Sequence, residues 1–235
     1  MVSKFTEIDS RINQIGDKKE DLAEVVSLVK SKILDLAIRG KLVAQDPNDE
    51  SASVLLERIR AEKEELIKQG KIKRDKKESI IFRGNDNSYY ETINGETICI
   101  DDELPFELPE GWEWTRLQNI SSILTDGTHK TPQYSDNGYI FLSSKNVTTG
   151  KMLCIYLRNY MKNCITVWHQ NNVICSSYVQ EYFNKSLKGI GVPNLHLEHV
   201  RKTLIPIPPY TEQQRITKIT ERVSKSLDEI SGILS

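Results

Sequence analysis

Two short polar runs in the middle of the chain carry the side-chain types that contact nucleic acids. The first follows Gly127 and combines hydroxyls with a histidine and a lysine, and the second follows a strand-like run and combines hydroxyls with a lysine and an amide. Cations bind phosphates, whereas hydroxyl and amide groups also read base edges. Both runs are either DNA contacts or solvent-facing loops. The residues are Thr128, His129, Lys130, Thr131, Ser143, Ser144, Lys145 and Asn146.

A third candidate region surrounds the turn at residues 189–191. Lys185 and Lys188 precede this turn and are candidates for phosphate binding. Asn194 follows the turn and either caps the next segment or touches DNA. Together with the two polar runs, these residues form the predicted DNA-binding set.

Neither a metal site nor a catalytic site is predicted. His196 and His199 are three positions apart, but zinc needs further well-spaced ligands and the chain has no Cys-x-x-Cys motif. Packing is therefore the better interpretation of both histidines. No nucleophile–base pair and no glycine-rich phosphate loop stand out, so we expect no enzymatic activity and no cofactor on this chain. The four cysteines lack paired spacing and indicate reduced thiols; they are Cys99, Cys154, Cys164 and Cys175.

The composition is that of a soluble protein that can bury a core. Charged residues make up 28% of the 235 residues, the mean hydropathy is −0.46, and no apolar run approaches the roughly 18 residues of a membrane span. The N-terminus has no apolar signal core, so we expect a cytoplasmic location. The net charge of −1 hides an asymmetry, because residues 86–110 hold eight acidic residues and no Lys or Arg, whereas residues 111–210 hold ten basic and five acidic residues. One domain can therefore present a basic face to a polyanion.

The elements that would position these residues begin with a long helix. Residues 4–39 contain no proline and repeat aliphatic residues with 4-3 spacing, interrupted once by Lys19. A period of 3.5 held for about four heptads predicts a coiled coil roughly 50 Å long, which should end at Gly40. Such a seam needs a partner helix of similar length. Its residues are Ile8, Ile12, Ile15, Leu22, Val26, Val29, Ile33 and Leu36.

A second helix and a basic linker are expected over residues 46–85. Ser51 or Ser53 is the predicted N-cap, and Gly70 should end the helix. Residues 71–77 hold five cations, which form either a solvated linker or a phosphate contact.

Mixed α and β structure is predicted for residues 111–210, after a short hairpin around Asn94–Gly95. Trp112 and Trp114 lie on the first strand and are better explained as core or subunit contacts than as base-stacking platforms. The predicted strands are Trp112–Leu117, Tyr139–Leu142, Asn172–Cys175 and Thr203–Ile207.

A second apolar helix follows this region. Three prolines within residues 205–210 require an extended backbone there. Thr211 and Gln214 form a predicted capping box, in which the threonine hydroxyl caps the glutamine amide. The helix carries an apolar stripe, so the two terminal helices can pair with each other and with a second copy. The stripe is Ile216, Ile219, Val223, Leu227, Ile230 and Leu234.

Five separated blocks, in order along the chain, resemble type I restriction–modification specificity subunits. The first resembles the conserved helical region of that family, the second and third resemble the entry and early body of its target recognition domain, and the last two resemble its exit into the next helix. The exit block is the most specific of the five. The blocks are Lys32–Val43 with Asp46–Lys63, Leu108–Trp114, Asp126–Pro132 with Phe141–Val147, Gly189–Leu197 and Ile205–Arg215.

The resemblance implies DNA recognition without chemistry on this chain. Specificity subunits hold two target recognition domains apart on a pair of long helices, and each domain reads half of a split sequence. The helices dock methyltransferase subunits, which hold S-adenosylmethionine, and the full complex adds a translocating restriction subunit. This chain has room for one recognition domain, so it resembles a half-subunit whose homodimer would read a split palindromic target on double-stranded DNA.

We therefore predict an α+β fold with one mixed target recognition domain flanked by long coiled-coil-forming helices. One departure from the family lies between Gly150 and Tyr178, where relatives have more chain, so the domain is expected to be internally shortened. The alternative function is an assembly protein that dimerises or docks the methyltransferase without selective DNA reading. The expected boundaries are 1–45 for the first helix, 46–85 for the second helix and linker, 86–210 for the recognition domain and 211–235 for the last helix.

Overall fold

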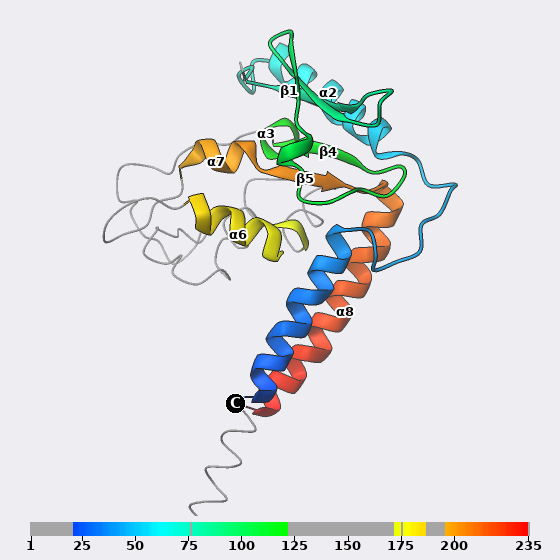
Figure 1. The fold of residues 1–235 in the computed structure, drawn as a ribbon, viewed down its shortest axis with the longest axis vertical. Coiled ribbons are helices and arrows are strands. Elements are labelled where there is room, and N and C mark those ends of the chain that lie inside the picture. The colour runs from blue at the N-terminus through cyan, green and yellow to red at the C-terminus, as the bar shows by residue number, and fades with distance from the viewer. Residues whose placement is uncertain (1–20, 76, 122–171, 175, 187–195, 235) are drawn as a thin grey trace, which may run out of the picture.

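Two long helices form a stalk beneath a mixed α/β domain (Figure 1). The structure, a computed structural model, describes residues 21–75, 77–121, 172–174, 176–186 and 196–234. The stalk consists of the helix over residues 21–38 and α8 (Tyr210–Leu234), which run side by side in opposite chain directions in both ribbon views. Lys30 Nζ and Asp228 Oδ1, 2.5 Å apart, join the two helices.

The first stalk helix ends at Gly40, as expected. Gly40 has φ +64°, and the N–H groups of Gly40 and Lys41 donate to carbonyls of the last turn at 3.2 and 2.9 Å, which is the Schellman arrangement. Helical residues 21–38 confirm the described part of the predicted helix, and residues 4–20 lie outside the described residues. A Cβ atom on Gly40 would lie 2.4 Å from Pro109 Cγ, so this helix end packs directly on the domain.

The second helix is also confirmed. α2 (Ala52–Lys68) begins after the N-cap Ser51, whose side chain accepts the Ser53 N–H. Gly70, with φ +69°, ends it. The helix contacts the domain through its buried residues Ala52, Leu55 and Leu56.

Three antiparallel strands in the order β1-β2-β3 form the first sheet. Asn94 and Gly95 join the last two strands with φ values of 52° and 88°, as a type I′ turn requires, so the hairpin is confirmed. β1 lies within the stretch expected to be a basic linker. The strands are β1 (Ser79–Arg83), β2 (Tyr89–Ile93) and β3 (Glu96–Cys99).

The second sheet pairs two segments from opposite sides of the domain sequence. β4 (Glu113–Arg116) is antiparallel to β5 (Leu204–Ile207), with Trp114 opposite Pro206; this confirms the first and last predicted strands. Trp114, Ile205 and Ile207 are fully buried, as the core interpretation of the tryptophan requires. Residues 139–142 lie outside the described residues. The remaining elements are the 3-10 turn η1 (Asp101–Glu103), α3 (Leu117–Ile120), α6 (Ser177–Ser186) and α7 (Leu197–Lys202).

The strand predicted at Asn172–Cys175 is wrong for its described residues. Residues 172–174 form a wide helical turn that leads into α6, and Ser176 N–H and Oγ donate to the Val173 carbonyl at 3.1 and 2.5 Å. Val173 and Ile174 are fully buried. A short apolar run indicates burial but does not distinguish a strand from a helical turn.

The capping box predicted at Thr211 is also wrong. α8 begins one residue earlier, at Tyr210, because the Pro209 carbonyl accepts the Gln213 N–H at 2.9 Å. The Thr211 hydroxyl instead donates to the carboxylate of Asp49. A tertiary partner therefore replaces the local one, while the preceding extended segment, β5, is confirmed.

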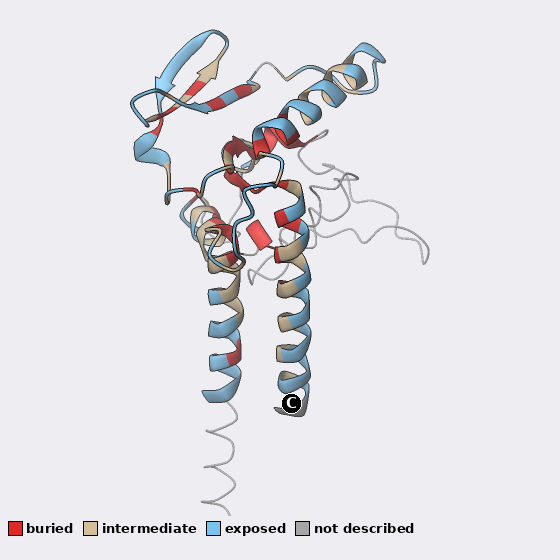
Figure 2. Ribbon diagram, turned by 90° about the vertical axis from the view of Figure 1, so that its right-hand side faces the viewer, coloured by how far each residue is buried: buried red, intermediate tan, exposed pale blue. Residues whose placement is uncertain are grey.

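The junction between stalk and domain is buried and hydrogen-bonded. Glu212 of α8 is 1% exposed, and its carboxylate accepts from Trp112 Nε1 at 3.0 Å and Gln45 Nε2 at 2.8 Å. Arg215 Nη2 binds Asp49 Oδ2 at 2.5 Å beside it. Figure 2 shows buried residues concentrated at this end of the stalk. These bonds fix the direction of the stalk relative to the domain.

The described residues bear on the expectations for cysteines, metal sites and membrane spans. Cys99 is exposed and is not in a disulfide, while the other three cysteines are not described. Within the described ranges, no group of three possible ligands could hold a metal ion. No described helix is long and apolar enough to pass through a membrane.

Candidate nucleic-acid interface

One residue of the predicted DNA-binding set lies within the described chain. Lys185 is near the C-terminus of α6, its side chain is 80% exposed, and its ammonium lies 3.8 Å from Glu181 one turn earlier. Because exposed pairs of this kind are weak, Lys185 remains available to an anionic ligand. The residues outside the described ranges are Thr128, His129, Lys130, Thr131, Ser143, Ser144, Lys145, Asn146, Lys188 and Asn194.

Cations from the linker and from α7 meet on one surface. We call this surface, which carries Lys77, Arg201 and Lys202, the α7 face. Lys77 and Lys202 both bind the carboxylate of Glu198, at 2.9 and 3.5 Å, and Arg201 lies 3.8 Å from Asp75. The hydrogen bond from Lys77 is the main reason that the pKa of Glu198 is lowered. Lys77 of the linker is therefore held against α7 by Glu198, which it shares with Lys202, and Asp75 of the linker pairs with Arg201.

The two histidines of this region lie in ring contacts. The ring centroids of His196 and His199 are 6.4 Å apart, and His199 meets Tyr182 edge-on at 6.4 Å. His199 is partly buried, which agrees with a packing role, whereas His196 is exposed and does not bear out that interpretation.

A buried ion network positions the α7 face. Arg116 of β4 donates through Nε and Nη2 to both oxygens of Glu91 on β2, at 2.6 to 3.2 Å. It also donates to Glu103 at 2.8 Å and, through Nη1, to the Lys202 carbonyl at the end of α7 at 2.9 Å. One guanidinium thus joins the first sheet, the second sheet and α7.

The network holds its charges despite burial. Burial raises the pKa of Glu91, but the hydrogen bonds from Arg116 and Ser79 outweigh it, so the pKa is lower than that of a free glutamate. Ser79 Oγ donates to Glu91 at 2.5 Å, and Asn119 joins the chain of bonds at 3.2 Å. Glu91 is therefore ionised in the folded protein, and its fixed charge keeps the guanidinium in place.

Sequence reasoning did not single out the α7 face or the Arg116 network. A signal for the face existed in the five cations of residues 71–77, for which phosphate contact was one of two interpretations. No signal existed for the network, because Arg116 and Glu91 are 25 positions apart and on different sheets.

The predicted stalk residues divide between buried and exposed positions. Val26 and Ile216 are buried, whereas Leu22, Val29 and Ile230 are 41%, 37% and 41% exposed. Ile8, Ile12 and Ile15 lie outside the described residues. The seam residues Ile33, Leu36, Ile219, Val223 and Leu227 are half-buried between the two helices.

An apolar ridge runs along the outer side of the first stalk helix. Leu28 is 69% exposed and Val25 is 51% exposed. Together with Leu22 and Val29 they are spaced so that all four lie next to one another on the helix surface. We call these four residues the stalk ridge. Pairing with α8 therefore leaves part of this helix uncovered in the described chain.

The chain is similar to known specificity proteins. The model of the type I restriction modification DNA specificity domain matches residues 62–234. The EcoAI specificity subunit of a type I restriction enzyme of Escherichia coli is 27% identical over 286 aligned positions, covering 99% of this chain and 46% of that protein. The EcoEI specificity subunit, also of Escherichia coli, is 50% identical over 98 residues, covering 42% of this chain and 14% of that protein. No solved structure matches.

The relatives differ from this chain in length, and their names state a role. The chain spans less than half of the length of either relative. The family description and both names state a specificity role, which agrees with the expectation that this chain is not an enzyme. Since the family model matches residues 62–234 out of 235, the chain belongs to the family of type I restriction modification DNA specificity domains.

Proposed function

We propose that this chain acts as the specificity (half-)subunit of a type I restriction–modification methyltransferase, which binds DNA sequence-specifically and positions methyltransferase subunits on a bipartite site. The observation that carries the proposal is the stalk, whose two extended helices are fixed to a family-type domain by buried hydrogen bonds. A domain on a rigid arm can set the distance between two readers, whereas a domain on a flexible tether cannot.

The proposed mechanism is positional. Cations of the α7 face and Lys185 set the register on the phosphates, and the polar runs at 128–131 and 143–146 read base edges. The family resemblance assigns S-adenosylmethionine to the methyltransferase and DNA cleavage to a restriction subunit. This role places the chain in the cytoplasm with the DNA.

Site selection on random duplexes tests the DNA role. The wild-type chain, with its methyltransferase, should enrich a split motif, and its affinity should fall with salt by a log–log slope of about −0.9 for each phosphate neutralised. Lys145→Ala should weaken binding. A flat salt response from a correctly folded chain would refute DNA binding.

We propose that the stalk ridge completes a coiled coil with a second copy of the chain. Val25→Glu with Leu28→Glu should abolish a homodimer in sedimentation experiments, because two charges would enter an apolar seam. Both side chains are largely exposed, so the fold should survive. Ser27→Glu adds one such charge to an exposed position of the same helix outside the stalk ridge and should leave the dimer intact. An unchanged dimer in the double variant would refute this assignment.

A specific observation supports the alternative assembly role. The alignment with the EcoAI subunit has 286 positions, whereas the chain has 235 residues, so this chain lacks residues that the relative has. If the missing residues lie between 150 and 178, the recognition domain is shortened. Formation of the methyltransferase complex without enrichment of any motif would favour the assembly role over DNA reading.

A further inference from the structure

One edge of β1 carries backbone groups that no strand within the described residues pairs. β1 bonds to β2 on one side only. Gly84 N–H donates to the Ser88 carbonyl at 2.8 Å where the two strands part. Because antiparallel bonds alternate along a strand, the N–H and C=O groups of Ile81 and Arg83 then point away from β2. The described residues offer the backbone of Ile81 no hydrogen-bond partner.

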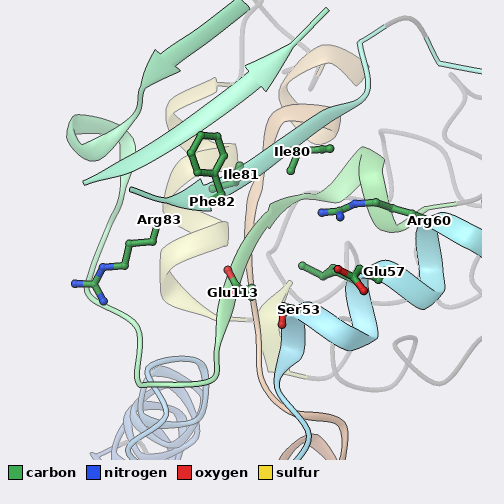
Figure 3. A pocket seen from close by; sticks show the side chains of 9 residues that line it. Ser53, Glu57, Arg60, Ile80, Ile81, Phe82, Arg83 and Glu113 are labelled. Atoms are coloured by element: carbon green, nitrogen blue, oxygen red, sulfur yellow. The ribbon is translucent and has the colours of Figure 1, made fainter. Parts of the chain in front are cut away.

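A groove of about 310 Å³ runs along this edge (Figure 3). α2 forms one wall with Leu56, Glu57 and Arg60, and β1 forms the other. Ile80 and Phe82, on the outer face of β1, are 45% and 41% exposed. The groove therefore combines an open strand edge with exposed apolar side chains, which is the arrangement that binds peptides by strand addition.

Glu113 gives the groove its charge preference. Its carboxylate, on β4, lines the groove beside α2, and within the described chain it has neither an ion pair nor a hydrogen bond. Burial raises the pKa of Glu113, and the nearby charge of Arg60 lowers it only in part. Glu57 adds a second carboxylate to the lining. A cation from outside would supply the partner that this half-buried carboxylate lacks.

We propose that this groove binds an extended segment of a partner protein, in which a lysine or arginine stands between two apolar residues. The segment adds to β1 as an outer strand and bonds to the backbone of Ile81 and Arg83. Alternate side chains of a strand face opposite sides, so the apolar pair packs on Ile80 and Phe82 while the cation reaches Glu113. The Ser79 N–H at the start of β1 already donates to Asn119 Oδ1 at 3.2 Å, so the segment pairs over Ile81–Arg83, a span of about 10 Å. This binding does not require DNA reading.

Peptide selection against the full chain tests the proposal. Random nine-residue peptides displayed on phage should enrich an apolar–basic–apolar pattern. The synthetic form of the enriched peptide, followed by fluorescence anisotropy, should bind Glu113→Gln about tenfold more weakly, because a charge-assisted contact becomes neutral. Glutamine preserves the size of the side chain, and an unchanged melting temperature checks the fold. Glu110→Gln is the matched control, since Glu110 is an exposed acid three residues away, and it should bind normally.

A second measurement locates the contact. Hydrogen exchange at the amides of Ile81 and Arg83 should slow at least about tenfold with saturating peptide. Arg83→Pro removes an N–H that faces outward, which an edge strand tolerates, and should abolish binding. Selection without the alternating pattern would overturn the proposal, as would protection confined to other strands. Protection of β1 that depends on chain concentration without peptide would also overturn it, because the occupant would then be a second copy.

Discussion

Removal of the Arg116 guanidinium should destabilise the protein by about 4 kcal/mol. Arg116 is 7% exposed and Glu91 is 2% exposed, and the two side chains share hydrogen bonds at 2.6 to 3.2 Å. Truncating one partner of a buried pair leaves the other charge without compensation, which costs about 3–5 kcal/mol. Arg116→Ala also frees Glu103 and the Lys202 carbonyl, both of which lie nearer the surface.

Replacing both partners measures the interaction between Arg116 and Glu91 apart from their contacts with other residues. In Arg116→Met with Glu91→Leu, apolar side chains of similar volume remove both charges, so most of the lost stability should return. Urea denaturation followed by tryptophan fluorescence measures each free energy of unfolding. A double-mutant cycle should give a coupling energy above about 2 kcal/mol. Additive losses, or an Arg116→Ala variant within about 1 kcal/mol of the wild type, would refute the assignment.

The same pair predicts an acid dependence. Burial raises the pKa of Glu91, but the hydrogen bonds outweigh it and the net pKa is lowered. The folded state therefore binds this proton more weakly than the unfolded state. The stabilisation is complete above the unfolded pKa of about 4.3 and is lost as the pH falls through the lower folded pKa. The double variant should lose less stability than the wild type over this range.

Three further changes test the α7 face, the stalk and the junction. Glu198→Gln frees two lysines, so DNA affinity at about 0.1 M salt should rise and the salt slope should steepen by about 1; Glu229→Gln, far along the stalk, should change neither quantity. Gly70→Ala should cost about 1 kcal/mol for its positive φ, and Gly40→Ala at least twice as much because its Cβ meets Pro109; equal urea midpoints would contradict the close packing. Burial raises the pKa of Glu212. The stability that this carboxyl group contributes to the fold is therefore present below the unfolded pKa and is lost as the pH rises through the folded pKa. Glu212→Gln, which keeps an acceptor, should therefore melt no lower than the wild type at pH 8, and a lower melting temperature would show that the charge stabilises the junction.

Features that depend on neighbouring residues were predictable from the sequence. Gly40 and Gly70 end their helices because glycine adopts positive φ without strain, and Asn94–Gly95 forms a hairpin because asparagine and glycine are the residues that best accept positive φ. The strands around Trp114 and Ile205 followed from their β-branched and aromatic residues, whereas their pairing with each other was not predicted. Each of these features is decided within a few positions of the chain.

Features that depend on distant residues were not predictable. Thr211 has the correct type for a cap, but Asp49 takes its hydroxyl. Val173 and Ile174 are buried, but the helical turn that replaces the predicted strand depends on hydrogen bonds from Ser176 and from Gln180 of α6. The groove beside β1 needs α2 and Glu113, which are separated from β1 in sequence. Of the predicted DNA-binding residues, Lys185 alone lies among the described ones, and its exposure agrees with that role without testing it.

The buried junction at Glu212 has a mechanical consequence, because the stalk acts as a lever. With 25 residues in α8 and a rise of 1.5 Å per residue, the arm is about 37 Å long, so a tilt of about 5° at its base moves its far end by about 3 Å. That displacement is close to the rise of a single base pair, about 3.4 Å. In the proposed DNA role, the stiffness of the hydrogen bonds among Gln45, Trp112 and Glu212 would set whether the far end of the arm is placed to within one step of a duplex.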